Sequence, residues 1–256
     1  MKCNLLRYIV LLIGSWTLSV FQCSGMSSGF SNETLHYVIS YKWGLIHKDA
    51  GEATLRLVRK GDNYSISLAA KTKPWADRIF MVRDTLLATV RTDGFKPLSY
   101  HKISHEGGKY GKDEISYSYS GRNVTGHCRR YREKKGKVSS SSKTLSAQGP
   151  VYDMLTIFYY LRLIDYSKLT KGQMLKSTVF SGSKSETVTV RCLGKTTLKM
   201  RKGGTREAYH IRFNFTTGGK KKSSADMDTW ISTDSSHIPL MLVGQLPVGQ
   251  VKCYLM

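Results

Sequence analysis

Residues 41–57 (YKWGLIHKDAGEATLRL) carry side chains that enzymes often place around a substrate. His47 and Asp49 could act as a base and its partner, with Trp43 beside them as an apolar contact. No serine in a nucleophile-elbow pattern lies nearby in the sequence. We therefore interpret the segment as a tight corner between two strands, in which Gly44 allows a bend and Trp43 contributes a packing surface.

Two histidines spaced four residues apart are the best candidates for a metal site. His101 and His105 lie on or just after a predicted strand, and the zinc-protease pattern His-Glu-x-x-His is absent from the sequence. A surface pair is therefore favoured over a metal site. The sequence also contains no Cys-x-x-Cys pair and no phosphate-binding or dinucleotide-binding glycine loop. We expect no catalytic residues, no bound metal and no cofactor.

Positive charge is the strongest chemical signal in the composition. The chain has 40 Lys and Arg against 18 Asp and Glu, a formal net charge of +22. The basic residues gather in runs at 129–137, 195–202 and 220–222. Such a surface attracts polyanions, which in a cell envelope are anionic lipid headgroups, lipopolysaccharide and acidic glycans. The alternative is that the lysines only keep exposed sheet edges soluble and unpaired.

The N-terminal residues predict export. Lys2 and Arg7 precede an uncharged run over residues 8–21, which has the length of a signal-peptide hydrophobic region and is too short to span a bilayer. Cleavage after Gly25 removes residues 1–25, and lipidation of Cys23 is the alternative. We expect an exported protein, which excludes nucleic acid as a partner.

The mature chain, residues 26–256, has a length that suits a single domain with a large core. It contains no further segment apolar enough to cross a membrane. Cys128, Cys192 and Cys253 remain, so at most one disulfide can form and one thiol is left over.

The elements that must position these residues are mainly strands. Apolar and polar residues alternate at 54–58 and 64–68 on either side of Gly61-Asp62-Asn63, which predicts a hairpin. A second hairpin is predicted at 85–92 and 95–103, with a two-residue turn at Asp93-Gly94. Further strands are predicted at 115–119, 124–131, 186–193, 198–201, 210–215, 230–232, 239–246 and 250–254. So many sequential strands indicate an antiparallel meander.

One segment departs from this rhythm. Residues 151–166 (VYDMLTIFYYLRLIDY) place apolar side chains at helical spacing after Pro150, which predicts a helix over 151–165. More than half of its circumference is apolar, so a curved sheet is expected to wrap around it. The Ser-rich stretch 135–149 before it is predicted to be a polar loop, and a shorter helix is predicted at 74–79.

Four segments together resemble an exported bacterial family known only as domain of unknown function 3108. They are LHYVISYKWGLIHKDAGEATLRL, AKTKPWADRIFMVRDTLLATVRTDGFKPLSYHK, VYDMLTIFYYLR and WISTDSSHIPLMLVGQLPVGQVKCYL, in this order along nearly all of the mature chain. The resemblance implies a mainly β fold: an antiparallel, curved, unclosed half-barrel meander around one central α-helix, similar to the lipoprotein-carrier (Lol) fold. It also implies a location in the periplasm, or in association with the outer membrane, of a Gram-negative bacterium.

Three functions are compatible with this fold. The favoured one is a non-enzymatic binding or carrier module for a lipid or other amphiphile, with lining candidates Trp43, Trp75, Phe80, Met154, Phe158 and Tyr159. The alternative is a structural or interaction protein whose basic surface holds anionic lipids or glycans. A hydrolase or transferase would require a cluster of titratable groups in the concavity, for which the sequence offers no constellation.

Overall fold

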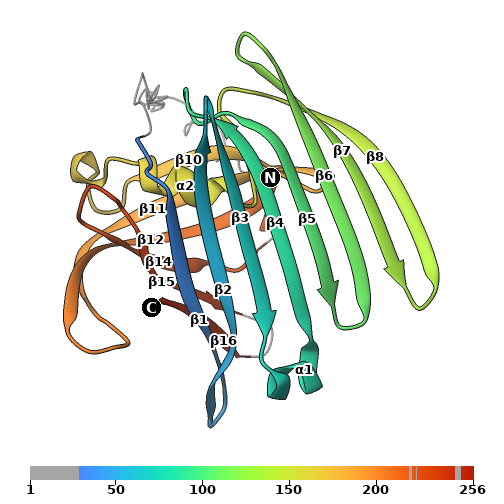
Figure 1. Cartoon of the computed structure of the whole chain (residues 1–256). Coiled ribbons are helices and arrows are strands. Elements are labelled where there is room, and N and C mark those ends of the chain that lie inside the picture. Colours follow the sequence, from blue (N-terminus) through green and yellow to red (C-terminus); the bar gives the residue numbers. More distant parts are fainter. Residues whose placement is uncertain (1–28, 219–220, 223, 246–248) are drawn as a thin grey trace, which may run out of the picture.

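Most of the described chain folds into one 16-stranded β-sheet (Figure 1). The computed structural model describes residues 29–218, 221–222, 224–245 and 249–256, so the predicted signal peptide lies outside the described residues. The N-terminal strands are β1 (Glu33–Trp43), β2 (Ile46–Lys60), β3 (Asn63–Thr72), β4 (Val82–Arg91), β5 (Pro97–Glu106), β6 (Lys109–Ser120), β7 (Asn123–Lys134) and β8 (Lys137–Gln148). The C-terminal strands are β9 (Val151–Asp153), β10 (Met174–Ser181), β11 (Lys184–Lys199), β12 (Thr205–Thr217), β13 (Lys221–Lys222), β14 (Met227–Ser232), β15 (Pro239–Gln245) and β16 (Gln250–Leu255).

The strand order joins the two halves of the chain at the middle of the sheet. It runs β8-β7-β6-β5-β4-β3-β2-β1-β16-β15-β14-β12-β11-β10-β9, and β13 pairs with β12 off this path. The pairing of β1 with β16 sets Tyr37 opposite Leu255. Every pair is antiparallel except β9 with β10. The predicted antiparallel, mainly β fold is therefore confirmed.

The sheet is more nearly closed than predicted. It curls until residues of β8 approach β11 and residues of β9 approach β5, which leaves one seam between the two edge strands. The curl follows from the twist of a long sheet whose main hydrophobic core lies on one face. The prediction of an open half-barrel around one helix therefore holds only in part, because the sheet forms an almost complete barrel and the described chain contains two α-helices.

The central helix is shorter than predicted. Residues 151–153 form β9, and α2 spans Thr156–Leu163. The reason is tertiary, because Val151–Asp153 pairs with β10 and the Asp153 carboxylate accepts hydrogen bonds from the amides of Leu155 and Thr156 at 2.9 and 2.8 Å. A second helix, α1, spans Pro74–Phe80 and matches the helix predicted at 74–79. Neither described helix is long and apolar enough to cross a bilayer.

Two other local predictions are wrong. The Ser-rich segment predicted as a loop is strand β8, which pairs with β7 over its whole length. The turn between β4 and β5 is longer than two residues, because Gly94 and Phe95 both adopt positive φ and the Phe95 ring enters the core, where it is 1% exposed. A buried aromatic ring thus takes precedence over the tight turn that Asp93-Gly94 would favour.

Two hydrophobic clusters lie on opposite faces of the sheet. The main core fills the inside of the barrel and includes Ile157, Tyr159 and Leu161 of α2. The second cluster contains Leu198, Ala208, Leu240, Met241 and Val243, with Met200, Trp230 and Tyr254 packed against it. Successive side chains of β14 point to opposite faces of the sheet, so Ile231 packs in the main core and the neighbouring Trp230 packs against the second cluster.

The three described cysteines are free thiols. Cys128 and Cys192 are buried in the main core. Burial raises the pKa of the Cys128 and Cys253 thiols to about 11, which keeps both groups protonated and unreactive at neutral pH.

Candidate functional site

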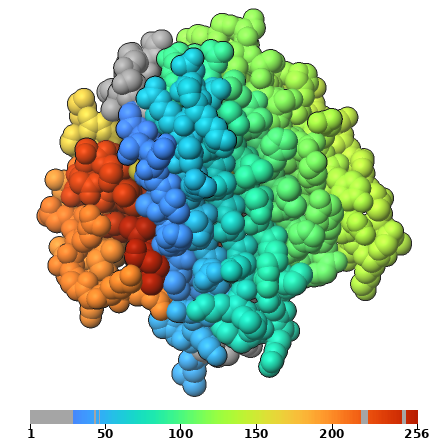
Figure 2. Space-filling view, in the orientation of Figure 1, coloured from blue at the N-terminus to red at the C-terminus, as the bar shows by residue number. Residues whose placement is uncertain are grey.

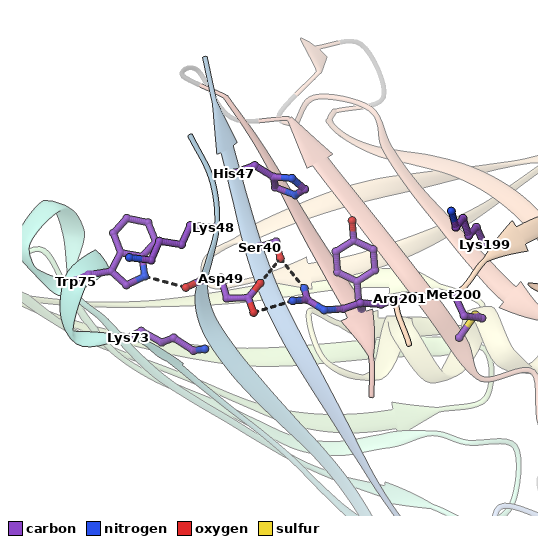
Figure 3. A pocket seen from close by; sticks show the side chains of 10 residues that line it. Ser40, His47, Lys48, Asp49, Lys73, Trp75, Lys199, Met200 and Arg201 are labelled. Carbon is purple, nitrogen blue, oxygen red and sulfur yellow. Dashed lines mark hydrogen bonds and ion pairs between the residues drawn. The ribbon is translucent and has the colours of Figure 1, made fainter. Parts of the chain in front are cut away.

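A pocket of about 800 Å³ lies where three distant parts of the chain meet, and we call it the cationic pocket (Figure 3). The β1–β2 hairpin and α1 form one side, and the turn after β11 together with β16 forms the other. Its lining residues are Ser40, His47, Lys48, Asp49, Lys73, Trp75, Lys199, Met200, Arg201 and Tyr254. Pockets that hold small ligands have volumes in this range.

The pocket lies on the outer face of the barrel, beside the second cluster. Tyr37 and Leu255 are opposite each other and both pack on the main core. The next pair, Val38 and Tyr254, therefore faces outward, and Ser40 shares that face two residues further along β1. This is the face on which Tyr254 meets Met241.

A partly buried hydrogen-bond network holds the floor of the pocket together. The register of β1 and β2 shifts after Ile39, which places Asp49 opposite Ser40, and the Ser40 hydroxyl donates to the Asp49 carboxylate at 2.7 Å. Arg201 donates to Ser40 Oγ at 2.9 Å and to Asp49 Oδ2 at 2.7 Å. Burial alone would raise the pKa of Asp49, but the hydrogen bonds from Ser40 and Arg201 outweigh it and hold the pKa below its ordinary value.

Aromatic rings form the walls. The Trp75 indole of α1 donates from Nε1 to the Asp49 carbonyl at 2.8 Å, which fixes the ring against β2. Lys48 Nζ lies 5.1 Å from the centre of the Trp75 ring, and the Arg201 guanidinium lies 5.4 Å from the centre of the Tyr254 ring. Both contacts lie within cation–π range, so the rings orient the cations as well as supplying apolar surface.

The pocket has a large excess of positive charge. Asp49 is its one carboxylate, and Arg201 neutralises it. Lys48, Lys73 and Lys199 form no ion pair with any described residue. Three uncompensated ammonium groups beside two aromatic rings suit a ligand that has an acidic group and an apolar part.

The structure does not bring the six predicted lining residues together. The Trp43 side chain lies outside the described residues. Trp75 lines the cationic pocket, whereas Phe80 is exposed at the end of α1. Met154, Phe158 and Tyr159 pack in or against the main core around α2.

Most residues of the cationic pocket were not predicted from the sequence. His47 and Asp49 of residues 41–57, which the sequence suggests as a possible base and its partner, both line the pocket. Arg201 belongs to the basic run at 195–202, but its contact with Asp49 spans 152 residues of chain and carries no local signal. The signal present in the sequence is the combination of two features, Asp49 in the β1–β2 hairpin and a basic run elsewhere in the chain.

A second group of ionisable side chains lies on the inner face of β4 to β7, and we call it the inner ion-pair row. Lys102 contacts Asp84 and Glu106, each at 3.0 Å. Asp113 accepts from Arg130 at 3.0 Å and from Arg132 at 2.7 Å. Burial raises the pKa of Asp84, whereas the hydrogen bonds from Lys102 and Asp84 keep that of Glu106 low despite burial.

This row is the kind of titratable cluster that a hydrolase would require in the concavity. Its members are, however, engaged with one another in two ion-paired groups, one around Lys102 and one around Asp113. The histidine pair does not join it: His101 contacts Glu114 at 3.5 Å, and His105 packs on Tyr110. Among the described residues, no three His, Cys, Asp or Glu side chains gather in a way that could hold a metal ion.

Comparison with known proteins identifies the fold and the family. The crystal structure of a beta-barrel-like protein of domain of unknown function DUF1849 from Brucella abortus matches with a TM-score of 0.59, over 89% of this chain and 96% of that chain. The sequences are 10% identical, so the likeness is one of fold alone. No curated protein matches the sequence. The family model described as "Protein of unknown function (DUF3108)" matches residues 36–256. The resemblance seen in the four sequence segments is therefore confirmed, and the chain belongs to the DUF3108 family.

Proposed function

We propose that this protein is a non-enzymatic binding module of the cell envelope that holds an anionic amphiphile in the cationic pocket. The observation that carries the proposal is the set of uncompensated ammonium groups of Lys48, Lys73 and Lys199 around the rings of Trp75 and Tyr254. The acidic group of the ligand contacts the lysines. Its apolar part lies against the rings and Met200.

The inside of the barrel is a weaker candidate for the ligand. Leu155 and Tyr159 are each 0% exposed and join the main core, where Phe30 and Phe95 pack on the Tyr159 ring. An acyl chain would have to displace these side chains, at the cost of their packing. At the cationic pocket, by contrast, the space is already open.

Binding of a fluorescent fatty acid tests the proposal. Lys48→Gln, Lys73→Gln and Lys199→Gln combined remove the three uncompensated charges and should weaken binding by at least about tenfold. The matched control, Lys60→Gln, Lys176→Gln and Lys184→Gln combined, makes the same change in net charge at exposed positions outside the pocket. The control should bind as the unaltered protein does. Equal binding by both triple variants would contradict a localised site.

The strong net charge of +22 favours a second candidate, in which the whole basic surface holds anionic lipids or glycans. Co-sedimentation with phosphatidylglycerol vesicles separates the two functions. If diffuse attraction holds the vesicles, both triple lysine variants should lose the same fraction of vesicle binding, and added salt should abolish vesicle binding. A pocket predicts that only the first variant loses binding.

The proposed location in the cell envelope requires export, for which residues 2–21 are the evidence. The mature protein isolated from the envelope of a Gram-negative host should begin at Met26, and intact mass spectrometry measures this directly. A mass that includes a lipid on Cys23 would instead establish a membrane-anchored lipoprotein.

A further inference from the structure

The edge of the sheet formed by β8 is unusually open. Among the described strands β8 pairs with β7 alone, and it ends the strand order. All residues of 137–144 are exposed, and the first buried residue of the strand is Leu145. In Figure 1 β8 is the outermost strand of its half, and in Figure 2 its yellow-green atoms form the rim of the molecule.

The turn before β8 determines which backbone groups point outward. Lys135 and Gly136 have φ values of 49° and 73°, as in a two-residue type I′ turn, and Lys134 pairs with Lys137 across it. Residues flanking such a turn exchange hydrogen bonds, and the pattern then alternates along an antiparallel ladder without a register shift. Residues 137, 139, 141 and 143 therefore bond to β7. The N–H and C=O groups of Val138, Ser140, Ser142 and Thr144 point to the free side.

This edge lacks most features that protect sheet edges from pairing. Between Val138 and Ser142 it has no proline, no bulge and no charge. A groove of about 630 Å³ runs along its outer face. The groove is lined by Tyr110, Lys112, Glu114, Arg129, Arg130, Tyr131, Ser140, Ser141 and Ser142. A strand added to the free edge of β8 would place alternate side chains on the same face as this groove, beside its β8 border.

The charge around the edge selects the partner. The β7–β8 hairpin, residues 123–148, contains seven Lys and Arg (Arg129, Arg130, Arg132, Lys134, Lys135, Lys137 and Lys143) and one acid, Glu133. None of its four lysines forms an ion pair with a described residue. A second copy of the same hairpin would meet strong repulsion, whereas an acidic strand would be attracted.

We infer that the free edge of β8 binds an extended, acidic segment of a partner polypeptide by strand addition. The partner's backbone bonds to residues 138, 140, 142 and 144, and its acidic side chains meet Arg129 and the lysines of the hairpin. This site is independent of the cationic pocket.

The test uses a labelled peptide of alternating glutamate and valine and two double variants of the protein. Ser140→Pro with Ser142→Pro removes two outward N–H groups and leaves the ladder to β7 intact, because neither amide bonds to β7. Ser140→Ala with Ser142→Ala is the matched control that keeps both amides. Fluorescence anisotropy should show about tenfold weaker binding for the proline pair than for the alanine pair.

A second arm does not depend on how well the proline variant folds. The same peptide with every amide N-methylated keeps its charge but cannot donate hydrogen bonds, so it should bind the unaltered protein about tenfold more weakly. Equal binding of both peptides would overturn strand addition in favour of attraction by charge alone. Dimerisation of the protein that the proline pair abolishes would overturn the acidic partner in favour of a second copy.

Discussion

The carboxyl group of Asp153 is fully buried, since the residue is 0% exposed. Its Oδ1 bonds to the amides at the start of α2, but Oδ2 has no hydrogen-bond partner among the described residues. Burial raises the pKa of Asp153 to about 6. Because the pKa is higher in the folded than in the unfolded protein, the ionised group destabilises the fold above about pH 6. This penalty disappears as the pH falls through 6 towards the ordinary value of 3.8.

Replacing Asp153 with Asn should remove that pH dependence. The amide oxygen of Asn can still accept the hydrogen bonds of Leu155 and Thr156, and no charge is buried. Thermal unfolding between pH 4.5 and pH 7.5 should show a midpoint that falls with rising pH in the unaltered protein more steeply than in Asp153→Asn. Asp153→Leu, which loses the hydrogen bonds, should be less stable than Asn throughout. Parallel pH profiles for the unaltered protein and Asp153→Asn would refute this account.

Arg162 and Glu33 form a buried ion pair that joins α2 to the first strand. Their side chains are 2% and 17% exposed, Arg162 Nη2 donates to Glu33 Oε2 at 3.0 Å, and Nε donates to the Ser236 carbonyl at 3.1 Å. Arg162→Met leaves the largely buried Glu33 carboxylate without its cation and should lower the free energy of unfolding by about 3–5 kcal/mol. Denaturant unfolding measures this.

A double variant provides the control for that prediction. Arg162→Met with Glu33→Gln removes both charges and should be more stable than Arg162→Met alone. The exposed pair of Lys71 and Glu52, at 2.9 Å, offers a comparison, and Lys71→Gln should leave the unfolding midpoint nearly unchanged. If Arg162→Met and Lys71→Gln lowered the stability of the protein equally, the conclusion that burial makes the Arg162–Glu33 pair more important would be wrong.

At the scale of elements, one ring spans the seam between the two halves of the barrel. Phe180 of β10 lies in the main core, stacks with Tyr117 of β6 at 6.0 Å, and packs over Gly126 of β7. A Cβ at position 126 would lie 2.6 Å from the Phe180 ring. Gly126→Ala should therefore destabilise the protein by about 1–3 kcal/mol through overpacking.

The ring itself should matter more than the glycine. Phe180→Ala leaves a cavity at the seam and should cost about 3–5 kcal/mol. In that background Gly126→Ala should cost almost nothing, because the clashing atoms are gone. Urea denaturation of the two single variants and the double variant measures the coupling, and strictly additive losses would show that the two residues do not meet.

Strands and helices could be predicted where a local sequence pattern determines them. They could not be predicted where tertiary contacts override that pattern. The alternation at 54–58 and 64–68 lies within β2 and β3, and Pro74 begins α1. By contrast, the apolar spacing of 151–155 fits a helix, but pairing with β10 and the Asp153 carboxyl convert it to strand and turn. The serines of β8 have no core to alternate against, so their sequence resembles a loop although β7 pairs with them fully.

The candidate site was predictable only in part for the same reason. His47 and Asp49 could be recognised in one segment, and the basic run containing Arg201 in another. Nothing in either segment shows that the turn after β11 reaches the β1–β2 hairpin. That contact depends on how the C-terminal strands lie against β1.

At the scale of the whole molecule, the pairing of β1 with β16 is what unites the two halves. Deleting residues 250–256 removes the strand between β1 and β15 and exposes an unpaired edge on each. This chain should fail to fold cooperatively, whereas deletion of Met256 alone should change little. Circular dichroism and limited proteolysis distinguish these outcomes. A truncated chain that unfolds cooperatively would show that each half is stable by itself.

The neighbours of β1 also determine when the protein can fold. On one side β1 pairs with β2, which follows it at once, but on the other side it pairs with β16, which leaves the ribosome more than two hundred residues later. The middle of the sheet therefore stays open until β16 has been synthesised. Until then the barrel cannot close, and a chaperone has an exposed strand edge to hold.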